Sequence, residues 1–180
     1  LVVFFSSKGS AYVCRILDIV ATTGYGEPLS KQFKFEDGET VVAALSLDPR
    51  VRPPADAHLV AVTRGGLAMR FSLESHSDVS TRNGRLFAKV ADGDTVLGVK
   101  VVRGDVLLSV VSQLGRALTC RVDEVPVLQG PGKGVQVLKL GDGDKLLGFA
   151  VGEPLKVETD KGAAHEIGAG PSEVTARGGR

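Results

Sequence analysis

The feature that most constrains this chain is a glycine turn that recurs four times at similar spacing. Successive turn glycines stand 57, 49 and 47 residues apart, and each is followed two positions later by an alanine. The pairs are Gly9 and Ala11, Gly66 and Ala68, Gly115 and Ala117, and Gly162 and Ala164. A repeat of about 50 residues is typical of propellers and arrays, whose units stack to bury a shared core. We therefore divide the chain into units of roughly 1–48, 57–102, 105–152 and 153–180.

Two further turns follow in the same order within the units. The second turn is rich in glycine and contains Gly26, Gly84, Gly134 or Gly178. The third combines glycine with acids, at residues 37–39, 92–94 and 142–144. The fourth unit reaches Arg180 before any third turn, so we expect it to be truncated. With no initiating methionine, the chain is expected to be a piece of a longer protein.

The segments between turns have the pattern of β-strands. Glycine makes up 23 of 180 residues, well above the average of about 7 %, and it stands at the turns. The apolar runs between turns are only five or six residues long, which suits strands better than helices. The first of these runs, residues 1–5, lacks the basic start of a signal peptide. No run approaches the ~20 apolar residues that span a membrane. We expect an all-β domain with no long helix.

Side-chain alternation after the first turn predicts which residues are buried. Because successive strand residues face opposite sides of a sheet, positions three, five and seven after the glycine share one face. This face is apolar in units one to three, whereas the other includes arginine, so we expect strands half buried on a core. Cys14, Phe71 and Cys120 occupy the fifth position and are predicted to be buried at equivalent places. The two cysteines are therefore interpreted as packing residues rather than a disulfide.

The sequence lacks the residue patterns of metal sites, calcium loops and phosphate-binding loops. His58, His76 and His165 have no metal-ligand spacing, and two cysteines cannot complete a structural zinc site. The acidic third turns lack the series of aspartates and the terminal glutamate of a calcium-binding loop, so we interpret them as hairpin turns. No glycine-rich segment ends in the Gly-Lys-Ser/Thr of a phosphate-binding loop. No cofactor is expected.

The order of these motifs resembles the C-terminal domain of the A subunits of bacterial type IIA topoisomerases, DNA gyrase and topoisomerase IV. The segments that carry the resemblance are residues 5–12, 21–26, 62–66, 90–99 and 134–149. The resemblance covers nearly the whole chain. It implies a β-pinwheel, a propeller-like ring of four-stranded blades, here with three complete blades and a partial fourth.

The same resemblance implies a function in DNA topology. The family wraps duplex DNA around its outer rim and serves an ATP-dependent topoisomerase in the bacterial cytoplasm, at the nucleoid. Expected partners are duplex DNA, the ATPase B subunit, and the remainder of the A subunit, without a membrane. The family's cleaving tyrosine belongs to another domain, and neither Tyr12 nor Tyr25 has a supporting site here. We therefore expect an accessory module that is not an enzyme by itself.

Charge is the feature against which DNA binding must be weighed. The net charge is only +1, but residues 61–121 carry a local charge of +4 and the other residues −3. If the repeats stack around an axis, the Lys and Arg side chains near equivalent turns form a positive band. Such a band neutralises DNA phosphates without recognising the DNA sequence. We place the predicted DNA-binding residues at or beside the first and second turns. They are Lys8, Arg15, Arg64, Arg70, Arg82, Arg85, Arg116, Arg121, Lys133, Arg177 and Arg180.

Two alternatives stay open from the sequence. The near-neutral total favours weak wrapping, closer to topoisomerase IV than to a strongly wrapping gyrase, although residues 175–180 match the Arg-Gly-Gly-basic centre of the gyrase glycine–arginine box. The arginines could also simply solvate a surface. The competing function is a protein-interaction scaffold, which should carry aromatic rim positions. Seven Phe, two Tyr and no Trp, mostly in strand positions, favour DNA over a scaffold.

Overall fold

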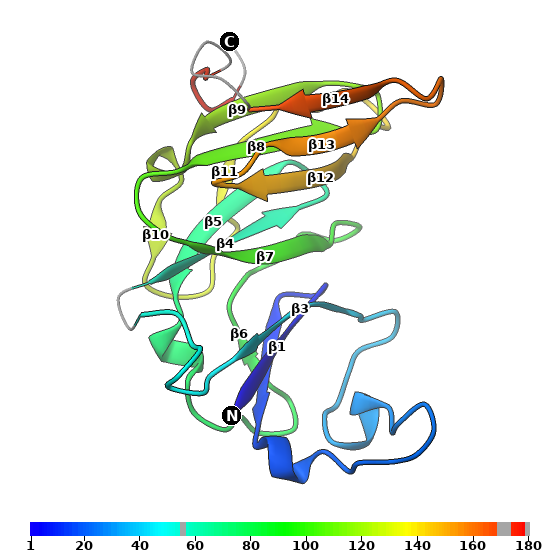
Figure 1. Ribbon diagram of the computed structural model, residues 1–180, viewed down its shortest axis with the longest axis vertical. Helices are drawn as coiled ribbons and strands as arrows, with labels where there is room; N and C mark the ends of the chain where they lie inside the picture. Colours follow the sequence, from blue (N-terminus) through cyan, green and yellow to red (C-terminus); the bar gives the residue numbers. More distant parts are fainter. Residues whose placement is uncertain (55–56, 169–173, 179–180) are drawn as a thin grey trace.

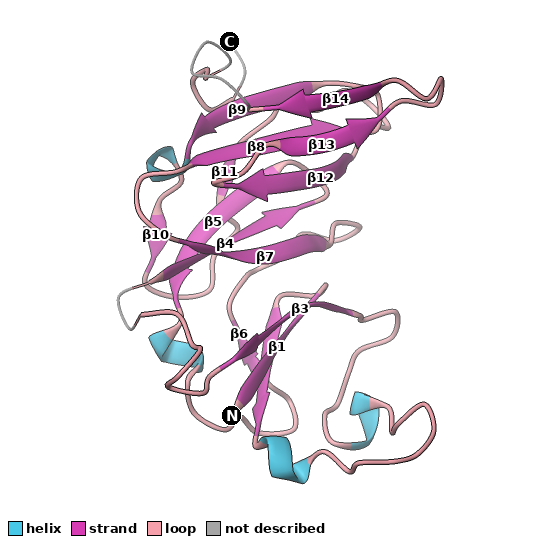
Figure 2. Ribbon diagram, viewed as in Figure 1, coloured by secondary structure: helices cyan, strands magenta, loops and turns pink. Residues whose placement is uncertain are grey.

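The protein is a row of β-sheets joined by loops and short turns (Figures 1 and 2). The computed structural model describes residues 1–54, 57–168 and 174–178. Within these residues the only helices are three-residue 3₁₀ turns, and none could span a membrane. The turns are η1 (Ile16–Asp18), η2 (Leu29–Lys31), η3 (Glu74–His76) and η4 (Val122–Glu124). The prediction of an all-β fold without a long helix is confirmed.

Each of the first three units contributes a hairpin with a third strand beside it. The first sheet contains β1 (Val2–Ser6), β2 (Ser10–Cys14) and β3 (Val41–Ser46). The second contains β4 (His58–Thr63), β5 (Leu67–Ser72) and β7 (Val96–Val102). The third contains β8 (Leu107–Ser112), β9 (Ala117–Arg121) and β12 (Leu146–Val151), and unit four forms the hairpin of β13 (Leu155–Glu158) and β14 (Ala164–Ile167).

The repeated glycine and alanine mark the same place in every hairpin. Each alanine is paired at the turn end of its hairpin, opposite Phe5, Val62, Val111 or Glu158. The glycines before them adopt positive φ, 87° at Gly9 and Gly66 and 80° at Gly115. A side chain is strained in this conformation, so glycine is the residue that closes the turn. The first repeat motif is therefore a hairpin turn.

The sheets are completed by strand exchange, which the repeat pattern did not predict. Strand β6 (Arg85–Leu86) comes from unit two but pairs with β2 of unit one. Strands β10 (Val127–Leu128) and β11 (Val135–Gln136) come from unit three but pair with β5 of unit two. In the same way, Val174 of unit four forms an isolated bridge with Thr119 of β9 in unit three. We call the surface formed by β6, β10, β11 and residues 174–178 the exchanged-strand edge.

Strand exchange also corrects the interpretation of the acidic third turns. The turn at residues 91–94 does not close a hairpin, because β6 before it pairs with β2 whereas β7 after it pairs with β4. Asp94 instead caps the first turn of its own unit, where Oδ1 accepts hydrogen bonds from Gly65 N at 2.8 Å and Thr95 N at 2.7 Å. Asp144 Oδ1 accepts from Leu114 N at 3.1 Å and Lys145 N at 2.9 Å. The repeated acid is a structural cap.

The core lies between consecutive sheets. One cluster joins Phe5 and Val13 of the first sheet to Leu59 and Phe71 of the second. A second cluster joins the opposite face of the second sheet to the third, with Val60 and Val62 against Leu108 and Cys120. Both faces of the second sheet are therefore buried, and the expectation of half-buried strands is wrong there. The reason is that the second sheet is packed by the first sheet on one face and by the third on the other.

The predicted burial of the fifth position is confirmed. Cys14, Phe71 and Cys120 are 5 %, 4 % and 0 % exposed, and they pair with Val2, Leu59 and Leu108 at equivalent registers. Both cysteines are free thiols. Burial raises the pKa of Cys120 to about 12, and it raises the pKa of Cys14 as well. These thiols are protonated packing groups, since reactive cysteines need a lowered pKa.

Candidate nucleic-acid interface

The two edges of the sheets differ in what surrounds them. Strands β3, β7 and β12 form one edge, and β7 lies in contact with both of the others. The opposite edge carries the exchanged strands, each crossing from the next unit. Consecutive units are therefore linked along the exchanged-strand edge. A ligand that follows this edge would meet equivalent residues of successive units in turn.

One exposed cation stands beside the second-turn glycine in each of units two, three and four. Arg85 follows Gly84, Lys133 precedes Gly134 and Arg177 precedes Gly178. Arg85 donates through Nη1 to the carbonyl of Ser75, and Arg177 donates through Nη1 to the carbonyl of Gln136 at 3.0 Å. None of the three cations forms an ion pair with a residue in the described part of the chain. Their charge is available to a phosphate.

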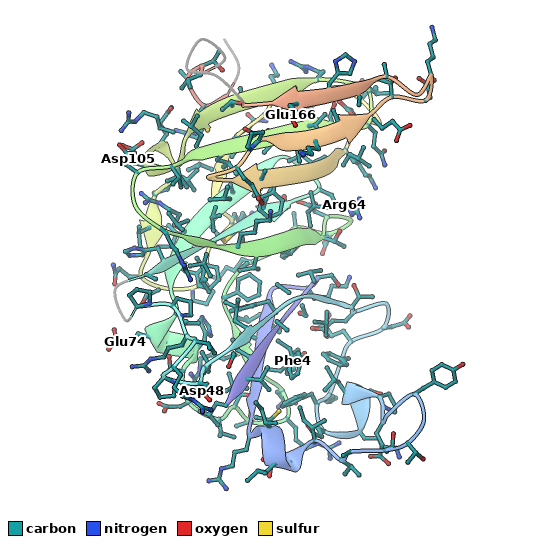
Figure 3. All side chains as sticks on the ribbon, viewed as in Figure 1. Phe4, Asp48, Arg64, Glu74, Asp105 and Glu166 are labelled. Carbon is teal, nitrogen blue, oxygen red and sulfur yellow. The ribbon has the colours of Figure 1, made fainter. Side chains whose placement is uncertain are left out.

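The first-turn cations lie at the same end of the hairpins as this row. Arg85 pairs with Ala11, directly after the turn that carries Lys8. Arg64 lies at the turn end of the second sheet, and Asp105 lies at the opposite end of the sheets (Figure 3). Arg116 follows Gly115, the first-turn glycine of unit three, and donates through Nη1 to the carbonyl of Lys139. The structure thus brings Lys8, Arg64 and Arg116 to the turn end of the sheets.

Three predicted residues lie elsewhere, which corrects their placement. Arg15 follows β2 and Arg121 ends β9, where Arg121 pairs with Leu107 at the end opposite the turn. A five-residue strand at about 3.3 Å per residue puts these side chains roughly 16 Å from the turn. Arg70 pairs with Val60 inside its strand. These arginines are only a few residues from the turn glycine in the sequence. An extended strand nevertheless places them far from the turn in space, and the residue count alone did not show this distance.

Arg70 and Arg121 are also engaged within the protein. Arg70 Nε donates to the carbonyl of Val125 at 2.6 Å, and Nη2 donates to the carbonyl of Asp123 at 3.3 Å. Arg121 forms ion pairs with Asp105 and, at 3.4 Å, with Asp123. The carboxylate of Asp105, followed by that of Asp123, raises the pKa of Arg121. A phosphate would have to compete with both carboxylates for this guanidinium.

The remaining predicted residues are Arg82 and Arg180. Arg82 is exposed beside unit one, and its Nη2 donates to the carbonyl of Lys31 at 3.4 Å. Arg180 lies outside the described residues, so the glycine–arginine box is described only through Gly178. Gly178 N donates to the carbonyl of Val137 at 2.7 Å, which holds this segment against unit three.

Sequence reasoning missed two cations on the crossing segments. Lys89 and Lys139 are exposed and occupy equivalent positions. Lys89 follows Ala88, which lies against Gly9, and Lys139 follows Leu138, which lies against Gly66. Ala88 N donates to the carbonyl of Gly9 at 3.2 Å, and Leu138 N donates to that of Gly66 at 3.5 Å. The signal was present, because both lysines stand three residues before the aspartate of a third turn.

The two tyrosines lie in contrasting environments. Tyr12 is buried, donates to Glu39 Oε1 at 2.9 Å and has its pKa raised to about 12, chiefly by burial. Tyr25 is fully exposed. Over the described ranges, no three His, Cys, Asp or Glu side chains gather as a metal site would require.

Comparison with known proteins identifies a family for most of the chain. The family model described as "DNA gyrase C-terminal domain, beta-propeller" matches residues 1–48, 57–103 and 107–152. A probable DNA gyrase A subunit of Oryza sativa is 29 % identical over 81 % of this chain and 15 % of the relative. The DNA gyrase A subunit of Escherichia coli is 24 % identical over 82 % of this chain and 17 % of the relative. The chain thus spans less than a fifth of these relatives.

Solved structures share the fold at low sequence identity. The C-terminal domain of DNA topoisomerase IV matches with a TM-score of 0.84 and 19 % identity, over 99 % of this chain and 56 % of that one. The E. coli ParC C-terminal domain matches with a TM-score of 0.79 and 22 % identity, over 99 % of this chain and 74 % of that one. The DNA gyrase A C-terminal domain gives 0.73 and 21 %, over 99 % and 57 %.

Proposed function

Because the chain belongs to the DNA gyrase C-terminal domain family, we propose that it binds duplex DNA without sequence preference along the exchanged-strand edge. Its relatives are DNA gyrase A subunits, so the chain is a topoisomerase-associated domain. The observation that carries the proposal is the row of Arg85, Lys133 and Arg177. One exposed cation whose side chain forms no ion pair among the described residues stands beside the equivalent glycine in three successive units.

The row suits phosphates better than base edges. Its cations lie one unit apart on the surface, whereas Gly84 and Gly134 beside them allow close packing on Tyr12 and Ala68 of the preceding unit. Phosphate contacts fix the path of DNA but carry no sequence information. The domain would orient DNA for the ATPase B subunit together with the remainder of the A subunit, without chemistry of its own. Unit one has Tyr25 and Glu27 beside its second-turn glycine, which supports a short DNA path and weak wrapping.

A salt titration of fluorescent duplex DNA tests the proposal. The variant replaces Arg85, Lys133 and Arg177 by Gln, and we expect its slope of log affinity against log salt to fall by about three units. The matched control replaces three exposed lysines outside the predicted set, Lys34, Lys145 and Lys161, by Gln. Equal effects of both variants would mean that net charge, not this edge, attracts DNA. Arg70 is left intact because its loss would leave the carbonyls of unit three unpaired.

The protein-scaffold alternative rests on a different surface. Leu17 and Tyr25 are 95 % and 113 % exposed in unit one, so this unit does present apolar side chains to solvent. If the unaltered chain fails to bind duplex DNA at low salt, the scaffold function gains over DNA binding. Location in the bacterial cytoplasm is proposed from bacterial relatives such as that of E. coli, although the relative from Oryza sativa is named chloroplastic/mitochondrial.

A further inference from the structure

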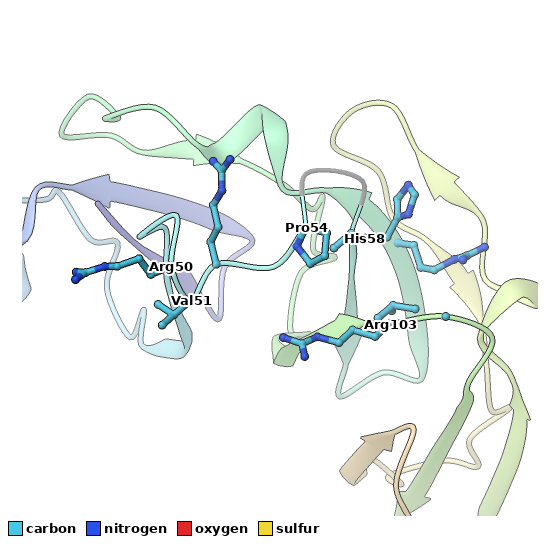
Figure 4. Close-up of a pocket in the computed structure, with 10 residues that line it drawn as sticks. Arg50, Val51, Pro54, His58 and Arg103 are labelled. Carbon is cyan, nitrogen blue, oxygen red and sulfur yellow. The ribbon is translucent and has the colours of Figure 1, made fainter.

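A cavity of about 350 Å³ lies between β6 and β10 of the exchanged-strand edge. Strand exchange brings its two walls together, because β10 of unit three pairs with β5 of unit two. Unit three contributes residues 127–131 to the lining. His58 also lines this cavity, and it borders a separate one beside the linker between units one and two (Figure 4). The chief lining residues of unit two are Phe71, His76, Arg85, Leu86 and Phe87.

One wall of the cavity is a buried aromatic cluster. The rings of Phe71 and Phe87 are stacked with their centroids 5.0 Å apart. The His76 ring is nearly perpendicular to both, and its centroid lies 5.7 Å from that of Phe71 and 6.4 Å from that of Phe87. Beside this wall Leu86 is 50 % exposed and Leu128 is partly buried. Covering such a surface with a ligand ring removes apolar area from water, which favours binding.

The guanidinium group of Arg85 lies beside the aromatic wall. Its Nη1 donates to the carbonyl of Ser75, which also lines the cavity. Burial lowers the pKa of His76 most, and the charge of Arg85 lowers it further, so these two side chains are close in space. Arg85 forms no ion pair with any residue of 1–54, 57–168 or 174–178. After its bond to Ser75 the guanidinium keeps N–H donors for an anion.

An apolar wall beside a positioned cation defines the chemistry of the ligand. The wall favours a flat aromatic ring, and the guanidinium favours a carboxylate, sulfonate or phosphate group. The volume falls within the ~300–1,000 Å³ of small-ligand sites. We propose that this cavity binds small aromatic anions, with the ring packed against Leu86 and Leu128 and the anionic group held by Arg85.

Anilinonaphthalene sulfonate (ANS) is the probe, because it joins an aromatic ring system to one sulfonate and fluoresces when it leaves water. A fluorescence titration of the whole 180-residue chain measures its binding. The test variant combines Arg85→Gln with Leu86→Ser, and it should weaken ANS binding by about tenfold or more. The thermal midpoint should stay that of the wild type, because both side chains are exposed.

The matched control combines Arg82→Gln with Val79→Ser. It also alters an exposed arginine and an apolar residue, which is 49 % exposed, but neither residue lines the cavity. ANS affinity should change by less than about twofold in this control. A wild type that does not bind ANS, or equal losses of affinity in the two double variants, would overturn the site.

The contribution of the anionic group is measured with phenylnaphthylamine, the neutral parent of ANS. The wild type should bind ANS about fivefold or more tightly than phenylnaphthylamine, and Arg85→Gln should abolish this preference. Arg85→Lys keeps the charge without the planar fork and should retain part of it. Equal binding of both probes to the wild type, or a preference that survives in Arg85→Gln, would overturn the role of Arg85.

A ligand in the cavity should also affect DNA binding, because Arg85 belongs to the row of cations beside the second-turn glycines. This consequence rests on the proposed function. Saturating ANS should lower the salt slope of duplex binding by about one unit in the wild type but not in Arg85→Gln. An unchanged slope in the wild type would overturn the consequence. If the Arg85, Lys133 and Arg177 experiment failed, the ANS titrations would still decide whether the cavity binds aromatic anions.

Discussion

Gly66 shows how a single backbone position serves both the hairpin and the crossing segment. Its φ is +87°, and an added Cβ would lie 2.5 Å from the carbonyl oxygen of Leu138. Gly115 occupies the same repeat position with φ +80°, but nothing lies within 4 Å of its Cβ position. The two glycines therefore separate the cost of the turn from the cost of the crossing.

We predict that Gly66→Ala destabilises the fold much more than Gly115→Ala. The left-handed conformation costs an alanine about 1 kcal/mol at either site. At Gly66 the crossing backbone must also move, which should add at least ~2 kcal/mol. Urea unfolding of both variants measures the difference. Equal losses of stability would show that the crossing segment does not constrain the turn.

His76 is a buried titratable group in an aromatic cluster. It is 4 % exposed, and its ring centroid lies 6.3, 5.7 and 6.4 Å from those of Phe5, Phe71 and Phe87. Burial, followed by the charge of Arg85, lowers its pKa to about 4. The folded state therefore holds a neutral imidazole where the unfolded chain binds a proton below pH ~6.5.

Stability should consequently fall as the pH is lowered from about 6.5 toward 4. The unfolded state takes up the proton first, and a depression of about 2.5 pKa units corresponds to about 3 kcal/mol. His76→Leu, of similar size, should remove this part of the pH dependence. His165→Gln, at an exposed position, should keep it. Urea midpoints between pH 4 and pH 7 provide the measurement, and a pH dependence that persists in His76→Leu would refute the assignment.

At the scale of elements, the 3₁₀ turns after the first three hairpins show what a neighbouring sheet contributes. Ile19, His76 and Val125 stand ten residues after their turn glycines and are 39 %, 4 % and 0 % exposed. Val125 packs in the cluster between the second and third sheets. Ile19 follows η1 in unit one, whose sheet has no preceding sheet among the described residues. The same turn is thus buried or exposed according to what precedes it.

Val125→Ala should cost about 2 kcal/mol, because it removes two buried carbons and leaves a cavity. Ile19→Ala should cost less than about 0.5 kcal/mol, although it removes more apolar volume. Thermal or urea unfolding of the two variants provides the comparison. A large loss at Ile19 would mean that the first sheet is already covered by a partner in solution, such as a second copy of the chain, and the oligomeric state would then decide.

Local elements were predictable from the sequence because their chemistry is local. The glycine at positive φ and the alternation that buries Cys14 and Cys120 both depend on a few adjacent residues. Strand exchange was not predictable, because β6, β10 and β11 are two-residue strands whose partners lie in another unit. The same limit applies to the site. The cations beside turn glycines could be named, but the engagement of Arg121 by Asp105 could not.

At the scale of the whole molecule, the placement of the acidic residues reconciles a net charge of +1 with a cationic edge. Several acids are committed to structure, since Asp94 and Asp144 cap turns and Asp105 pairs with Arg121. Burial alone would raise the pKa of Asp144, but the hydroxyl of Ser112, the backbone amides of Leu114 and Lys145 and the charge of Arg116 together lower it. The cations of the exchanged-strand edge are not compensated in this way among the described residues. Net charge therefore understates the positive charge of this edge, on which the proposed DNA binding depends.

Strand exchange should also make the first three sheets unfold together. Each exchanged strand ties one sheet to the next, so opening a sheet exposes the core that it shares with its neighbour. In repeat proteins such coupling between neighbours sets the cooperative unit. The hairpin of β13 and β14 differs, because among the described strands these two pair only with each other and most of their residues are exposed.

We predict that amides of β13 and β14 exchange with deuterium at least ~100-fold faster than those of β4 and β8. A two-stranded hairpin is marginally stable by itself and opens without disturbing the shared cores, whereas β4 and β8 exchange only when a sheet opens. Hydrogen exchange followed by mass spectrometry measures both regions in one experiment. The Val125→Ala variant is the internal control, since it should accelerate exchange in β4 and β8 together while leaving β13 and β14 unchanged. Equal protection of β14 and β8 would show that the fourth unit is held as firmly as the first three, because a hairpin that opened alone could not protect its amides to that degree.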